Sequence, residues 1–272
     1  MDVIEQRVTS KAGLQGPCED GIVVTPHHAA VIDGATDKSC MHFEGVSGGQ
    51  FAMQACAQAI ANLAPDADAS TAVQRLTETL RSRLPDKLSI SDRPSAVVAI
   101  YSAQRREIWR VGDVSIWYDG MSPRGGAHQN RVDFYASGVR AAVLTAELIS
   151  GRTVEELRGE DYGRAAILPL LVRQGVFANN PDAGEWAYGA INGNPVPESL
   201  VETYPIPEGA RTVILASDGY PLVLPTLDET EKQLHDLLRE DPLCIGPLKG
   251  TKGVRPGAES YDDRSYLRLA VS

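Results

Sequence analysis

The 272-residue chain has few cysteines and few aromatic residues, which make up 6% of it. The four cysteines, Cys18, Cys40, Cys56 and Cys244, form no CxxC pair and no spacing typical of a zinc site. Free, mostly buried thiols are the ordinary state of such cysteines. We therefore expect neither a disulfide framework nor a zinc centre.

The chain also lacks an excess of basic charge and long apolar runs. Its formal net charge is −10 and its pI about 5.0, which argues against nonspecific nucleic-acid binding. No apolar run reaches the roughly 18–20 residues that span a bilayer. The first residues, MDVIEQRVTSKAG, have no apolar core typical of a secretory signal. We expect a cytoplasmic protein with no nucleic-acid partner and no membrane partner.

Several familiar catalytic signatures are missing. There is no GxGxxG or Walker A pattern, so a nucleotide cofactor is not expected, and no nucleophile elbow for a Ser-His-Asp hydrolase. The phosphatases of the haloacid dehalogenase type need a second aspartate two residues after the first. Ala35 stands at that position after Asp33, which excludes this class.

The spacing of apolar residues predicts strands in clusters, with helices between the clusters. This order indicates an α+β fold, with antiparallel sheets flanked by helices, rather than alternating βα units. The stretch 177–197 is rich in Asn, Gly and Pro and is expected to be a long loop, a common place for substrate recognition. The expected strands are 21–24, 29–32, 95–102, 107–120, 198–204, 211–217 and 265–271. The expected helices are 51–64, 69–84, 138–150, 153–158, 163–175 and about 226–239.

Two Asp-Gly pairs each follow an apolar run: Asp33-Gly34 in AAVIDGATD and Asp218-Gly219 in TVILASDGY. Each pair alone is typical of a turn. Acidic pairs also precede the first and the last of these strands, at Glu19-Asp20 and Asp262-Asp263. Carboxylates that converge at the rim of a core repel one another unless a cation lies between them. Oxygen ligands of this kind favour Mg²⁺ or Mn²⁺.

At these residues the chain resembles the metal-dependent protein phosphatases, the protein phosphatase 2C family. CEDGIVV is similar to the family's Glu-Asp motif, and AVIDGATD to its Asp-Gly motif. The hairpin that contains Gly112-Asp113, then TVILASDGYPLVL, then ESYDDRSYLRL match its later motifs in the same order. Any one match is weak, but five in order are fairly specific and cover nearly the whole chain.

The resemblance implies a single domain, residues 1–272, in which two stacked antiparallel sheets are flanked by helices on both outer faces. It also implies two Mg²⁺ or Mn²⁺ ions, which can activate a shared water to attack phosphate. By motif position, Asp33 would bridge the ions and the Gly34 carbonyl would bind one. Asp20, Asp33 and Asp218 would be the catalytic residues. The implied metal ligands are Glu19, Asp20, Asp33, Gly34, Asp113, Asp218 and Asp262, and Asp113 with Asp218 would serve a doubtful third ion.

The chain departs from the family where phosphate and the leaving group are handled. After Asp33-Gly34 it reads Ala35-Thr36-Asp37, without the histidine that acts as general acid in some members; His42 is a weak substitute. The family's phosphate-binding arginine has no clear match. Gln15 stands near its place, and Arg7 and Lys11 are the stand-ins. Lys249, Lys252 and Arg255, in a glycine-rich loop before Asp262, are further candidates for binding phosphate, although a solvated loop is the plainer interpretation.

Three functions follow from these features. The first is a metal-dependent hydrolase of phosphoserine or phosphothreonine in proteins, with a hydroxide between the two metals as nucleophile. The second keeps this chemistry but acts on a small phosphorylated metabolite. The third is a noncatalytic regulatory pseudophosphatase, against which the retention of five acids argues. The physiological substrate is not predicted by the sequence.

Overall fold

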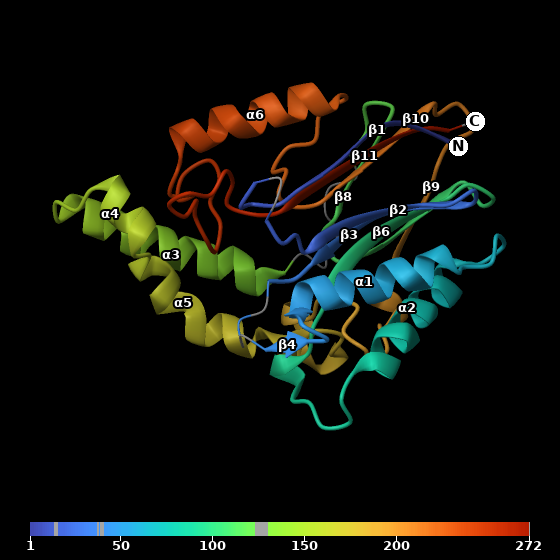
Figure 1. Ribbon diagram of the computed structural model, residues 1–272, viewed down its shortest axis with the longest axis horizontal. Coiled ribbons are helices and arrows are strands. Elements are labelled where there is room, and N and C mark those ends of the chain that lie inside the picture. Colours follow the sequence, from blue (N-terminus) through green and yellow to red (C-terminus); the bar gives the residue numbers. More distant parts are fainter. Residues whose placement is uncertain (14–15, 37, 39–40, 123–129, 272) are drawn as a thin grey trace.

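Two antiparallel sheets stack face to face in the computed structural model (Figure 1), which describes residues 1–13, 16–36, 38, 41–122 and 130–271. One sheet has the strand order β1-β11-β10-β8 and the other β2-β3-β6-β7-β9. The strands of the first are β1 (Asp2–Thr9), β8 (Ser115–Tyr118), β10 (Thr212–Ala216) and β11 (Arg264–Ala270). Those of the second are β2 (Asp20–Val24), β3 (His28–Gly34), β6 (Ala96–Ser102), β7 (Glu107–Val111) and β9 (Glu202–Pro205). A small hairpin, β4 (His42–Phe43) with β5 (Val46–Ser47), lies apart.

Helices cover both outer faces of the sandwich. The pair α1 (Gly48–Ala61) and α2 (Ala69–Arg83) packs on the five-stranded sheet, and α6 (Leu227–Glu240) lies over the four-stranded sheet (Figure 1). The α+β class and the helices on both outer faces, expected from the sequence, are confirmed. None of the helices in the described part of the chain is long and apolar enough to cross a membrane.

The alternation of side chains along β3 explains how these layers hold together. Val31 faces the other sheet, in a core that includes Leu215 and Leu267, whereas Ile32 faces α1 and packs near Phe51. Successive side chains of a strand point to opposite faces. The run AAVI is therefore apolar throughout, because both faces of β3 are covered.

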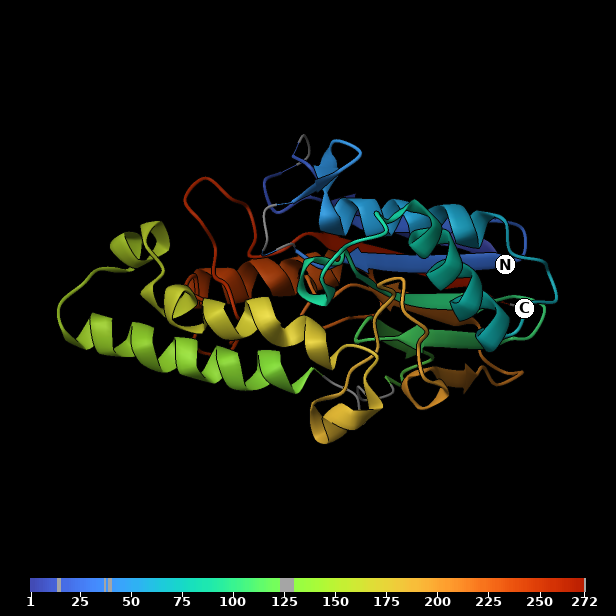
Figure 2. The same ribbon diagram turned by 90° about the horizontal axis from the view of Figure 1, so that it is seen from below.

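Three helices extend beyond one end of the sandwich. They are α3 (Arg131–Ile149), α4 (Val154–Gly159) and α5 (Tyr162–Arg173), and α3 lies beside α5 (Figure 2). Asn130 caps α3 by accepting hydrogen bonds from the backbone N–H groups of Val132 and Asp133. This cap places the first turn of α3 next to the ends of the central strands.

The expected strand over 107–120 is wrong as one element. It divides into β7 in one sheet and β8 in the other. The break falls at Gly112, whose φ of +90° is costly for other residues and whose missing Cβ leaves room for Val97. The chain thus crosses between the sheets at Gly112-Asp113. The segment 177–197 is irregular, as expected, with short 3₁₀ turns and isolated bridges such as Ala96 with Ile191.

Candidate functional site

Asp20 and Asp33 lie directly opposite each other on neighbouring strands, as partners in the β2–β3 register. Asp33 is followed by Gly34, whose N–H donates to the carbonyl of Glu19 at 3.1 Å. A Cβ at Gly34 would come within 2.5 Å of the Glu19 carbonyl oxygen and still closer to that of Gly49. Glycine is therefore required here so that the end of β3 can approach the Glu19-Asp20 segment closely.

Asp218 reaches the same region from the other sheet, just after β10. Its neighbour Ser217 accepts a hydrogen bond at Oγ from the Ser265 N–H, at 2.8 Å. Gly219 lies against the carbonyl of Asp263, where an added Cβ would clash. Pairing of β10 with β11 thus brings Asp218 beside the acidic pair Asp262-Asp263, although more than 40 residues separate them in the sequence.

The strand ends gather these acids at one end of the sandwich. Asp33, Asp113, Asp218 and Asp262 all line a cavity of about 180 Å³. Asp113 comes from the turn at which the chain crosses between the two sheets. Both sheets therefore contribute carboxylates to the cavity.

The pKa values of the inner carboxyl groups are raised by burial and by one another. Burial raises the pKa of Asp33 well above its usual range, and the charges of Asp218, Asp20, Asp262 and Asp113 raise it further. The pKa of Asp218 is also raised, although the residue is open to the cavity, because the surrounding protein displaces solvent and because Asp262 is near. Burial raises the pKa of Asp20 to about 7, against hydrogen bonds from Ser217 and Ser265. In the absence of a cation, these carboxyl groups therefore favour their neutral, protonated form.

Glu19 is buried and has both carboxylate oxygens engaged by side-chain donors. Ser47 donates to Oε1 at 2.7 Å, and Thr36 and Lys11 approach Oε2 at 2.9 and 3.3 Å. Asp263 is buried as well and accepts from the backbone N–H groups of Lys11 and Glu19, both at 2.8 Å. Asp263 therefore fixes the chain around Glu19.

Two lysines enter the acidic site, which the sequence alone did not reveal as a pair. Lys11 Nζ lies 3.3 Å from Glu19, 3.4 Å from Asp263 and 3.7 Å from Asp262. Lys252 Nζ lies 2.5 Å from Asp262 and 3.3 Å from the Thr36 hydroxyl. Burial lowers the pKa of Lys11, but the charges of Asp262, Asp263 and Glu19 outweigh this effect and raise it overall. Both lysines were singled out for phosphate, but the sequence does not show that Lys11 reaches Asp263, which lies 252 positions further along the chain.

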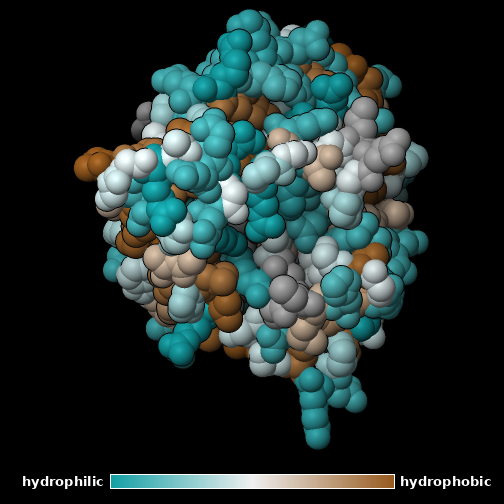
Figure 3. Space-filling model, turned by 60° about the vertical axis from the view of Figure 1, so that its left-hand side comes forward, coloured by the Kyte–Doolittle hydropathy of each residue, from teal (hydrophilic) through white to brown (hydrophobic). Residues whose placement is uncertain are grey.

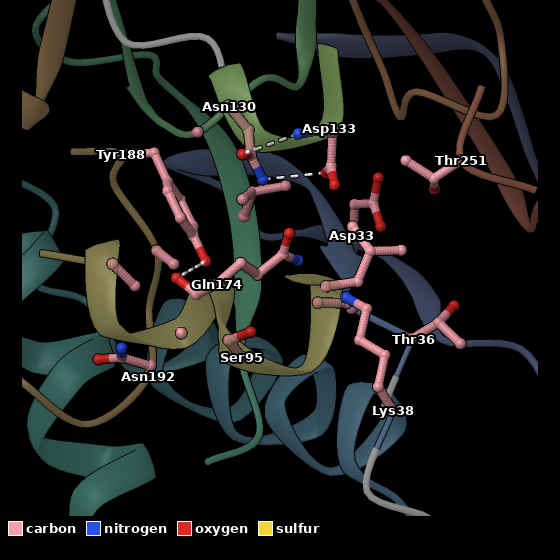
Figure 4. A pocket seen from close by; sticks show the side chains of 18 of the residues that line it. Asp33, Thr36, Lys38, Ser95, Asn130, Asp133, Gln174, Tyr188, Asn192 and Thr251 are labelled. Carbon is pink, nitrogen blue, oxygen red and sulfur yellow. Dashed lines mark hydrogen bonds between the residues drawn. The ribbon is translucent and has the colours of Figure 1, made fainter. Parts of the chain in front are cut away.

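The cavity continues from the acids to the start of α3 and to the segment before β9. Figure 4 shows Asp133, Asn130 and Gln174 on one side and Lys38 and Thr36 on the other. Asn130 Nδ2 donates to Asp133 at 2.9 Å. With its amide nitrogen turned toward Asp133, Gln174 lies 3.1 Å from that carboxylate and 3.0 Å from Lys38 Nζ. These residues were not predicted, because no motif marks them. The outer surface at this end is mostly hydrophilic (Figure 3).

The donor set suits a hard divalent cation, since Asp33 and Asp218 supply carboxylate oxygens whose mutual repulsion a cation would relieve. The arrangement is not a finished coordination shell. In the part of the chain that is described, no group of three or more His, Cys, Asp or Glu side chains is already placed to hold a metal ion. The residues therefore fit a cation in the chemistry of their oxygen donors.

Several other histidine, arginine and cysteine residues lie away from the cavity. His42 is exposed on β4 and His28 is buried against Trp109, and neither lines the cavity. Arg105 reaches the carbonyls of Asp66 and Ala67 from the β6–β7 turn. Cys56 and Cys244 are buried free thiols, as expected, and Cys18 is partly buried. Gln15, Asp37 and Cys40 fall outside the described residues.

No protein-family model matches the sequence, and no curated protein matches it. Solved structures match along almost its whole length. A single-substitution variant of a bacterial serine phosphatase is 8% identical, covers 100% of both chains and gives a TM-score of 0.50. The Mycobacterium tuberculosis serine/threonine phosphatase PstP/Ppp is 15% identical over 98% of this chain and 97% of its own, with a TM-score of 0.49. The PstP catalytic domain in complex with 2 manganese ions is 14% identical over 98% and 97%, with a TM-score of 0.46.

At these low sequence identities, the comparison supports a shared fold and nothing beyond it. The chain has the fold of a bacterial serine phosphatase, as the resemblance in its motifs implied.

Proposed function

We propose that this chain is a divalent-cation-dependent phosphomonoester hydrolase that acts on phosphoserine or phosphothreonine in proteins. The observation that carries the proposal is the meeting of Asp33, Asp113, Asp218 and Asp262 from two sheets at one cavity. Opposite placement of Asp20 and Asp33 in the β2–β3 register supports it. So does the fold, which the chain shares with a bacterial serine phosphatase. We take the chain as one catalytic domain in which residues 177–197 form the variable wall.

Asp33 and Asp218 are the proposed principal ligands of Mg²⁺ or Mn²⁺. The other proposed ligands, taken from the motifs, are Glu19, Asp20, Gly34 through its carbonyl, Asp113 and Asp262. When bound, divalent cations supply an activated water and neutralise charge on the phosphate. The resemblance implies two such ions.

The protein groups have separate tasks in this proposal. Asp20, which accepts a hydrogen bond from Ser265 at 2.9 Å, is proposed to orient the attacking water. Lys252 and Lys11 bring positive charge to a cleft that must accept an anionic phosphate. The hydroxyl of Thr36 lies between their ammonium groups and can hydrogen-bond to a phosphate oxygen.

A small phosphorylated metabolite is the second candidate substrate. The cavity favours it, because about 180 Å³ of space continues from Asp33 to a wall of polar side chains that includes Asn130, Asp133 and Gln174. Such a wall can hydrogen-bond to hydroxyl or amino groups of a compact ligand. Hydrolysis rates for a panel of phosphopeptides and of phosphorylated metabolites will decide between the two substrate classes.

The test of the activity itself is hydrolysis of para-nitrophenyl phosphate with Mn²⁺, with and without a chelator. We expect turnover by the wild type that the chelator abolishes. Asp33→Asn and Asp218→Asn should each lower the hydrolysis rate by at least about a hundredfold. This loss exceeds the one usually seen when a residue that hydrogen-bonds to a metal ligand is replaced. Asp86→Asn, at an exposed aspartate that does not line the cavity, is the matched control. A folded wild type with no turnover under any divalent cation would support the pseudophosphatase instead.

A further inference from the structure

The acids of the site differ in whether they form ion pairs. Glu19, Asp262 and Asp263 pair with lysine, whereas among the described residues Asp20, Asp33, Asp113 and Asp218 form no ion pair, and the charge of Lys252 reaches Asp218 only from further away. Among the described residues, no Lys or Arg nitrogen lies within ion-pair distance of Asp33 or Asp218. Asp262 differs, because Oδ1 faces Lys11 at 3.7 Å and Oδ2 faces Lys252 at 2.5 Å. Both of its carboxylate oxygens therefore already face an ammonium group.

Lys11 is built into this position. Its backbone N–H donates to Asp263 at 2.8 Å, and its carbonyl accepts from the Glu259 N–H at 2.9 Å. These two hydrogen bonds hold the backbone of Lys11. From there its ammonium group reaches three carboxylates, those of Glu19, Asp262 and Asp263. A divalent cation at this place would use the same oxygens.

The loop that carries Lys252 is also held in place by hydrogen bonds. Arg140, which is almost fully buried, donates to the carbonyls of Leu243, Cys244 and Gly250 at 2.8–3.1 Å. Arg164 donates to the carbonyl of Thr251, next to Lys252, at 2.9 Å. Helices α3 and α5 therefore anchor the loop on both sides of its turn.

We propose that Lys11 and Lys252 occupy the cation position beside Glu19 and Asp262, so that this chain binds one divalent cation, on Asp33 and Asp218. The proposal rests on the proposed function and changes the number of ions implied by the resemblance. A dication that coordinated Asp262 would lie a few ångströms from two ammonium groups, and Coulomb repulsion would weaken its binding. The ammonium groups supply the same sign of charge and present hydrogen-bond donors toward the cleft.

Binding stoichiometry tests this proposal without reference to activity. We would measure Mn²⁺ binding by isothermal titration calorimetry and native mass spectrometry for the wild type and for the double variant Lys11→Met, Lys252→Met. The wild type should bind one Mn²⁺ tightly. The double variant should gain a second ion, bound at least about tenfold more tightly than any second ion in the wild type. Lys232→Met, at an exposed lysine on α6, is the matched control and should keep the wild-type stoichiometry.

Two single variants test the proposal even if the double variant fails to fold. In Asp262→Asn, the proposal predicts that the tight Mn²⁺ remains, whereas in Asp33→Asn it should be lost. Two equally tight ions in the wild type would overturn the proposal, as would loss of the tight ion in Asp262→Asn. If the wild type binds two ions and the lysine variants raise only KM, the lysines serve phosphate and the proposal is wrong. Absence of Mn²⁺ binding together with absence of hydrolysis would instead contradict the proposed function.

Discussion

At the scale of single residues, the site is defined by which carboxylates are compensated. Glu19 and Asp263 are surrounded by hydroxyl, amide and ammonium donors, whereas Asp33 lies among other acids that raise its pKa. Because a buried charge without a partner is costly, the protonated form of these carboxyl groups is favoured in the absence of a cation.

The stability of the cation-free protein should therefore depend on pH. Burial raises the pKa of Asp20 from 3.8 to about 7, so its favourable contribution is complete below about pH 3.8 and is lost as the pH rises through about 7. Asp33 and Asp218, whose pKa values are also raised, act in the same direction. Thermal unfolding in a chelator should show the melting temperature falling over this range, and Mn²⁺ should reduce the fall. An Asp20→Asn variant should lose part of the pH dependence; an unchanged slope would contradict this account.

Close backbone approach at Gly219 is a second residue-scale feature. An added Cβ there would come within 2.0 Å of the Asp263 carbonyl oxygen. Gly219→Ala should lower the free energy of unfolding by about 1–3 kcal/mol, the usual cost of overpacking, and should displace Asp218. Urea denaturation measures the first effect and Mn²⁺ affinity the second. Gly209→Ala, where a Cβ would meet nothing within 4 Å, should change neither.

The sequence predicted the individual acids because each motif is local. Asp33 and Asp218 stand at the ends of apolar runs, and the pairing of their strands follows from the fold. Lys11 and Asp263 are 252 positions apart, and no local pattern indicates that they meet. The polar wall of Asn130, Asp133 and Gln174 was missed for the same reason, since it depends on how α3 and α5 lie against the sandwich.

At the scale of elements, the helices α3–α5 and the loop before β11 form one connected unit. Three arginines from these helices, Arg140, Arg158 and Arg164, donate to loop carbonyls between residues 243 and 255. Arg140 also pairs with Asp161 at 2.8 Å, which ties α3 to the start of α5. The position of Lys252 in the cleft therefore depends on helices that are remote from it in sequence.

Removal of Arg140 should disturb this unit. Arg140→Met removes the hydrogen bonds that Arg140 donates to three carbonyls and to Asp161. Loss of one partner from a buried ion pair usually costs about 3–5 kcal/mol of stability. We expect a lower unfolding free energy and faster limited proteolysis within residues 243–255. Arg152→Met is the matched control, because the Arg152–Glu147 pair is largely exposed and such pairs contribute about 1 kcal/mol or less. Equal effects of the two substitutions would argue against the anchoring role.

The boundaries of elements were predicted well where the apolar pattern was regular, as in β3, β6 and α2. The pattern failed at residues 107–120, because apolar alternation continues across Gly112 while the backbone changes sheet. It gave no signal for β1, whose residues are mostly exposed and which exists through its pairing with β11. Tertiary pairing, rather than local pattern, decides both cases.

At the scale of the whole molecule, the site lies at the seam between two sheets. Asp20 and Asp33 come from the five-stranded sheet, Asp218 and Asp262 from the segments that end β10 and precede β11, and Asp113 from the crossing between the sheets. A cation bound here would link the two halves of the sandwich. Its binding free energy would add to the stability of the whole fold.

The most direct test of the central claim is phosphate release from a phosphothreonine peptide by one preparation of the protein in three successive states. The account predicts release in Mn²⁺, none after chelation, and recovery when Mn²⁺ is restored. Release that continues unchanged in the chelator, or no release in any state by a protein shown to be folded, would contradict it.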